Sequence, residues 1–155
     1  MTAFAADTSV PIARSKVEIE NLIARYGASG FGVLVRPEGA CVMFEAHNRT
    51  VRFVLMMPGS EDSRFLRSPQ GRLRTKDQAK RAYEQEIRRL WRCLVLVIKA
   101  KLEAVQSGIV TFEEEFLAYT VLPSGRTVAE EVEAPLKQQL SGHRVLLLPG
   151  REEVS

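Results

Sequence analysis

The chain has little of what most directly names a function. It contains 155 residues but only two histidines, two cysteines and one tryptophan, and no apolar run reaches the roughly 18 residues of a membrane span. The N-terminal residues MTAFAADTSVPIAR lack the basic region and the apolar stretch of a signal peptide. We therefore expect a cytoplasmic protein without membrane contact, in which Cys41 and Cys93 stay reduced as small buried hydrophobes.

Residues for metal or cofactor chemistry are equally scarce. His47 and His143 stand beside turn residues, with no Cys, His or carboxylate at metal-ligand spacing, and no GxGxxG or phosphate-binding loop occurs. The glutamates at 113–115, with Glu45, could serve a metal-dependent nuclease. However, consecutive helical residues point in different directions, and acids in a first helical turn are explained by the helix dipole. We predict no catalytic site, no metal and no cofactor, and hence a non-enzymatic protein.

Length and composition predict one globular domain. With 45% hydrophobic and 26% charged residues, a chain of this size can bury a single core. We expect a flexible N-terminus over residues 1–13, a domain over 14–148 and a flexible tail over 149–155.

Four helix starts share one local signature, a Ser or Thr followed three residues later by Glu or Gln, which lets the two side chains satisfy free backbone donors. They are Ser15/Glu18, Thr75/Gln78, Thr111/Glu114 and Thr127/Glu130. They predict an N-terminal helix ending at Gly27, a long helix to Gln106, and short C-terminal helices over 112–119 and 128–140. Pro135 is expected to kink or end the last helix, and 145–148 to form an edge strand or pack loosely.

Three short runs rich in β-branched and aromatic residues precede the long helix. They are FGVLVR (31–36), ACVMFEA (40–46) and TVRFVLMM (50–57), and the turns PEG and HNR separate them. We predict an α+β fold: a three-stranded antiparallel β-meander packed by one long α-helix, with an N-terminal helix and two short C-terminal helices. The expected core joins one sheet face to one helix stripe, namely Val42, Phe44, Phe53 and Leu55 with Leu94, Val97, Ile98 and Leu102.

Charge is distributed unevenly along the chain. Residues 1–63 carry a net −1, residues 64–101 a net +9 and residues 102–155 a net −5. A block this basic contacts an anionic partner, pairs with the acidic C-terminal third, or is a solvated surface.

The basic block is the candidate binding site. Four arginines lie in the loop before the long helix, and we expect this loop to be mobile. Further arginines form a stripe along the long helix, and Lys99 continues this stripe. Arginine suits bidentate contacts with phosphate or carboxylate better than lysine does. No acid four residues away relieves Arg92, and Trp91 follows the apolar side of the helix, where it is expected to anchor the core. The predicted site residues are Arg64, Arg67, Arg72, Arg74, Arg81, Arg88 and Arg92.

Several segments together resemble a family of small uncharacterised proteins encoded by temperate phages and prophages. They are RSKVEIENLIARYGASGFGV, RTVRFVL, LWRCLVLVIKAKLEAVQSGIVTFEEEFLAY and VLPSGRTVAE, and the resemblance spans about residues 11 to 135. It implies a bacterial cytoplasm and an accessory role in DNA metabolism or in interference with host defence, but no catalytic residue.

Two functions follow from these observations. The first is a phage or prophage protein that binds nucleic acid, or a nucleoprotein complex, through residues 64–92. The alternative is an inhibitor of a host or anti-phage defence factor, whose acidic surface would meet the basic block. A homodimer is also expected, because the long helix extends beyond the meander and its N-terminal half needs cover.

Overall fold

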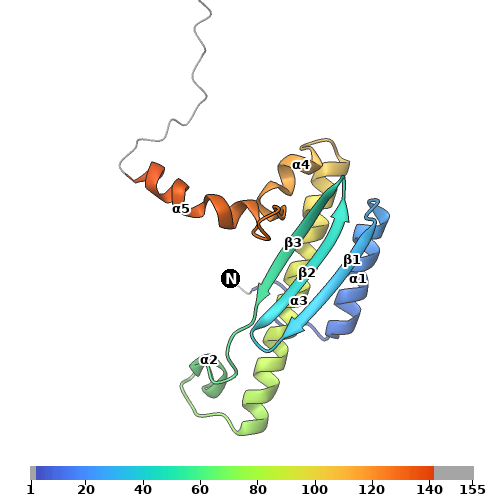
Figure 1. The fold of residues 1–155 in the computed structure, drawn as a ribbon. Helices are drawn as coiled ribbons and strands as arrows, with labels where there is room; N and C mark the ends of the chain where they lie inside the picture. The colour runs from blue at the N-terminus through green and yellow to red at the C-terminus, as the bar shows by residue number, and fades with distance from the viewer. Residues whose placement is uncertain (1–2, 142–155) are drawn as a thin grey trace, which may run out of the picture.

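The fold is α+β, as predicted, with one three-stranded antiparallel sheet and helices on one of its faces (Figure 1). The computed structural model describes residues 3–141. Its helices and strands follow in the order α1 (Ile12–Arg25), β1 (Gly30–Arg36), β2 (Gly39–Ala46), β3 (Arg49–Met56), α2 (Ser63–Leu66), α3 (Lys76–Gln106), α4 (Phe112–Glu115), the 3₁₀ helix η1 (Leu117–Tyr119) and α5 (Val128–Leu140).

The sheet is the predicted meander, with strand order β1-β2-β3. Val42 lies opposite Val33 on one side and Phe53 on the other. Because strand side chains alternate between faces, these residues share the face that α1 and α3 cover (Figure 1). On the opposite face, Leu34 and Val54 are more than half exposed.

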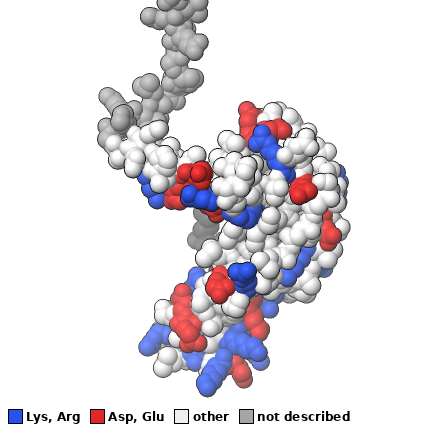
Figure 2. Space-filling view, viewed as in Figure 1, with Lys and Arg blue, Asp and Glu red and all other residues white. Residues whose placement is uncertain are grey.

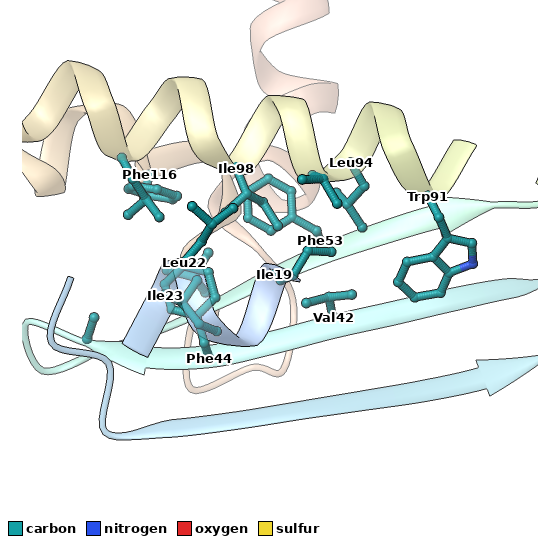
Figure 3. Close-up of a cluster of buried hydrophobic side chains, with 14 of the residues drawn as sticks. Ile19, Leu22, Ile23, Val42, Phe44, Phe53, Trp91, Leu94, Ile98 and Phe116 are labelled. Carbon is teal, nitrogen blue, oxygen red and sulfur yellow. The ribbon is translucent and has the colours of Figure 1, made fainter. Parts of the chain in front are cut away.

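The core lies between the sheet and the two long helices. Figure 3 shows side chains of α1 and α3 meeting those of β2 and β3, with Trp91, Ile98 and Phe44 among the most deeply buried. Phe116 closes one end of this core, with edge-to-face ring contacts to Phe44 and Phe53 at centroid distances of 5.8 and 6.3 Å. Trp91 thus anchors the core, as its place on the helix predicted.

Two details of the expected packing are wrong. Val97, placed in the core by helical spacing, is 39% exposed, and Val95 is buried instead. The first helix begins at Ile12 with Pro11 as its N-cap, so Ser15 is a buried residue inside the helix. A proline φ of −61° already suits a helix start, and the amide N–H of Ser15 donates to the Pro11 carbonyl.

The other three capping boxes are confirmed at Thr75, Thr111 and Thr127. The last helix, α5, does not end at Pro135 but continues to Leu140. Proline removes one backbone donor, but α5 is exposed from Ala129 onward, so water can reach the carbonyl that this donor would have bound. The strand predicted over 145–148 and the tail over 149–155 lie outside the described residues.

The long helix α3 has two parts, as its sequence suggested. Its fully buried residues run from Ile87 to Leu102, and its first turns extend past the sheet (Figure 1). The N-terminal segment that precedes α1 contacts α3. There the side-chain amide of Gln85 donates to the carbonyls of Ala6 and Thr8 at 2.9 Å each. Within residues 3–141, no helix combines the length and apolar character needed to span a bilayer.

Candidate nucleic-acid interface

Residues 61–84 form a protrusion at one end of the molecule, made of α2, the loop after it and the first turns of α3 (Figure 1). We call this segment the basic lobe, because it holds seven basic and four acidic residues. Phe65 of α2 is buried and meets the Tyr83 ring edge-to-face, at a centroid distance of 5.5 Å. This contact anchors the lobe to α3 and covers part of the helix for which we expected a second copy of the chain.

The loop after α2, expected to be mobile, is a hydrogen-bonded turn. Arg67 and Leu73 form an antiparallel bridge, and the Ser68 amide donates to the Arg72 carbonyl at 2.8 Å. Gly71 sits at the tip with a φ of +81°, a conformation that favours glycine. The turn therefore holds its arginines on a defined backbone.

Three of the predicted site arginines also stabilise the lobe. Arg74 donates to the carbonyls of Arg64 and Phe65 at 3.0 and 3.2 Å. These carbonyls near the C-terminal end of α2 thereby gain the hydrogen-bond partners that a helix end lacks. Arg67 donates to the Gly71 carbonyl at 3.0 Å. Arg64 pairs with Asp62 at 3.3 Å and lies over the Phe65 ring. Among residues 3–141, the guanidinium groups of Arg67 and Arg74 donate only to backbone oxygens, so no carboxylate there compensates their positive charge.

The two arginines predicted furthest along α3 lie outside the lobe and are engaged with other residues. Arg92 forms an ion pair with Glu18 of α1, a partner 74 residues away in the sequence, so spacing along α3 alone could not predict it. Its hydrogen bond to Glu18 is the main cause that lowers the pKa of that carboxyl. Arg88 donates to the Gln85 side chain at 2.7 Å and is half-buried. The stripe predicted that both side chains lie on an open helix face, but in the structure each contacts a neighbouring side chain.

The lobe, by contrast, presents cations that no carboxylate neutralises. Within residues 3–141, no Asp or Glu oxygen lies within 4 Å of five of its basic groups, namely those of Arg67, Arg72, Arg74, Lys76 and Arg81. All but Arg74 are exposed. Figure 2 shows blue side chains around the tip of this end, with red ones among them. Lys76 is not among the predicted site residues, which are all arginines, although it lies in the same basic block of the sequence.

As far as residue 141, the acidic C-terminal third does not fold back over the basic block. In the described part of the chain, one ion pair joins the two, between Lys101 and Glu115 at 2.9 Å. The lobe lies at one end of α3, and α4 follows its other end (Figure 1). A helix of 31 residues is about 46 Å long, which keeps the lobe away from the acidic residues of α4.

The carboxylates considered for a nuclease site have local roles. Glu114 completes the Thr111 capping box, and the backbone N–H of Thr111 is the main cause that lowers the pKa of Glu114. Glu115 pairs with Lys101. His47 stacks on the Phe112 ring at 4.5 Å. Between residues 3 and 141, no group of three or more His, Cys, Asp or Glu side chains is arranged to hold a metal ion.

The two cysteines are half-buried rather than fully buried, and both are free thiols. Burial raises the pKa of the Cys41 thiol.

Comparisons of the chain with models of known protein families, with curated proteins and with solved structures give no match.

Proposed function

We propose that this protein is a non-enzymatic binding protein that contacts the phosphate backbone of nucleic acid through the basic lobe. The observation that carries the proposal is the set of five cations without a carboxylate partner, gathered within residues 67–81. Phosphate contacts from Arg and Lys supply most of the affinity of sequence-independent binding, and they need no base-reading element. As part of the same proposal, the resemblance to phage and prophage proteins assigns this activity to a bacterial cytoplasm.

The binding residues of this proposal differ from the predicted stripe. The side chains of Arg72 and Arg81 are exposed and have no hydrogen-bond or ion-pair partner within the described part of the chain, so phosphates can reach their guanidinium groups without breaking an internal contact. Arg92, which is tied to Glu18, would have to exchange one anion for another. We therefore assign the lobe arginines and Lys76 to the interface and Arg92 to the packing of α1 on α3.

The test is a salt titration of binding to a labelled DNA duplex of random sequence. If about five phosphates are neutralised, log K falls with log salt at a slope of roughly −4.5. The double variant Arg72→Ala, Arg81→Ala should flatten this slope by about 1.8. The matched control is Arg25→Ala with Arg36→Ala, which removes the same net charge from exposed arginines outside the lobe.

Two results would contradict the proposal. Absence of affinity for DNA and RNA at low ionic strength would leave an acidic protein surface as the partner of the lobe, which is the inhibitor function. Equal slopes for the two double variants would show that overall charge, rather than the lobe, causes the binding.

A further inference from the structure

Strand β1 forms one edge of the sheet, and no strand within residues 3–141 pairs with its outer side (Figure 1). The other edge is different, because the N–H of Val121 donates to the Thr50 carbonyl of β3 at 2.8 Å. In an antiparallel sheet, alternate residues of an edge strand direct their backbone N–H and C=O groups away from the neighbouring strand. β1 therefore offers a row of backbone groups with which another strand can pair.

The side chains of β1 are also incompletely covered on both faces of the sheet. Toward the helices, Phe31 and Val33 are half-buried and Val35 is 49% exposed. On the face away from the helices, which we call the outer face, Leu34 is 54% exposed. Natural proteins commonly protect an edge strand with proline or with charged side chains, but β1 has one charged residue, Arg36, at its end. The edge thus keeps the features of a strand that pairs with another.

The order of small and large residues in β1 suits pairing with a copy of itself. Along the outer face, the strand has Gly30, Gly32, Leu34 and Arg36 in sequence. An antiparallel pair that uses the whole strand would be centred on Val33. In this register Gly32 would lie opposite the partner's Leu34, and Gly30 opposite the partner's Arg36.

The outer face has a hollow where the two glycines lie. Its volume is about 260 Å³, and its lining includes Gly30, Gly32, Met43 and Glu45. The partner's Leu34 would extend over this hollow and contact Met43, which is 38% exposed. Because such a pair is two-fold symmetric, each copy would both offer the hollow and fill that of the other.

Charge is complementary in the same register. The Glu45 carboxylate lies beside Gly30, since a Cβ placed on this glycine would be 3.5 Å from Oε2 of Glu45. The partner's Arg36 would lie two strand spacings, or about 9.6 Å, from the Glu45 backbone, a distance that the two long side chains can bridge.

The same two residues do not pair within one chain. Glu45 lies opposite Gly30, six positions from Arg36 along β1, which is a distance of about 20 Å. In the described residues, neither side chain has an oppositely charged group within 4 Å. Both charges therefore remain available to a second copy.

From these observations we infer that two copies of the chain associate through β1, which joins their sheets into one six-stranded sheet. Backbone hydrogen bonds between the two strands supply affinity, and the glycine hollow and the pair of Arg36 with Glu45 fix the register. This contact goes beyond the proposed binding of nucleic acid and is separate from the basic lobe. It also lies on a different element from the N-terminal half of α3, for which the sequence predicts a dimer contact.

Sedimentation equilibrium of the full chain over a range of concentrations tests the inference. We expect a reversible equilibrium between monomer and dimer. Leu34→Lys places a charged side chain at the paired edge and should raise the Kd of the dimer at least about tenfold. The matched control is Val54→Lys, because Val54 is 55% exposed on the same face but lies on β3. It should change the Kd less than about threefold. Circular dichroism melts confirm that both variants are folded.

Exchanged charges test the register. Arg36→Glu and Glu45→Arg should each raise the Kd about fivefold, because each sets like charges near one another at two symmetric places. The variant with both substitutions should return to within about twofold of the wild type. A contact within one chain would not give this recovery, because the two residues are too far apart there.

Three outcomes would overturn the inference. A monomer at the highest soluble concentration would leave the β1 edge to a strand of another protein. Equal losses for Leu34→Lys and Val54→Lys would place the contact on the sheet face, and no recovery in the double charge variant would exclude the pairing centred on Val33. The DNA titration of the lobe is run at concentrations where the chain is monomeric, so that Arg36→Ala in its control variant does not act through the dimer.

Discussion

Truncation of Leu94 tests the packing of α3 on the sheet directly. Leu94 is 7% exposed within the core, whereas Leu96, two residues further along the same helix, is 44% exposed. Leu94→Ala leaves a cavity between helix and sheet, and such truncations cost about 2–5 kcal/mol. Leu96→Ala removes the same atoms from a side chain that water already reaches, so we expect a loss below about 1 kcal/mol.

Urea denaturation followed by circular dichroism measures both changes. With a slope of about 2 kcal/mol per molar urea, a loss of 3 kcal/mol lowers the midpoint by about 1.5 M for Leu94→Ala, and Leu96→Ala should shift it by less than about 0.5 M. Equal shifts for the two variants, with unchanged slopes, would refute the assignment of the buried face of α3.

The remaining predictions concern the sheet, a helix cap and an ion pair. Gly39→Ala should cost about 1–3 kcal/mol, because its Cβ would lie 2.6 Å from a backbone oxygen of β3, while Gly32→Ala, with nothing within 4 Å, should change stability by less than about 1 kcal/mol in urea melts. Thr75→Ala should cost about 1 kcal/mol through loss of the cap of α3, measured in the same way. Arg92→Ala should cost up to about 1 kcal/mol at neutral pH. Since the folded-state pKa of Glu18 lies below its unfolded value of about 4.3, this difference should shrink as the pH of the melts falls from 5 to about 3, and a constant difference would contradict the ion pair.

Local chemistry explains what could be predicted from the sequence. The capping box at Thr75 involves residues three apart, and the absence of Gly and Pro up to Gln106 lets the helix continue, so both of its ends were predictable. The strands were predictable because alternating residues in each run share a face. The error at Ser15 arose because a capping pattern says where a helix can start, whereas Pro11 allowed an earlier start.

Long-range pairing explains what could not be predicted. Residues 94–98 read LVLVI, an unbroken apolar run in which helical spacing alone cannot decide whether Val95 or Val97 is buried. The partner of Arg92 lies on a different helix, and the turn that orders the lobe arginines depends on a bridge between Arg67 and Leu73. The sequence therefore indicated the basic region, but could not separate its unpaired cations from those used in packing.

The continuity of α3 sets a distance between the basic lobe and the other end of the core. The helix has 31 residues without Gly or Pro, and it joins the basic lobe to α4 as a stiff rod rather than a flexible linker. The 22 residues of α3 beyond the lobe would hold a bound nucleic acid about 33 Å from the far end of this helix. Because the basic residues gather at one end of this helix and the acidic ones follow its other end, the molecule would approach a polyanion with the lobe in front.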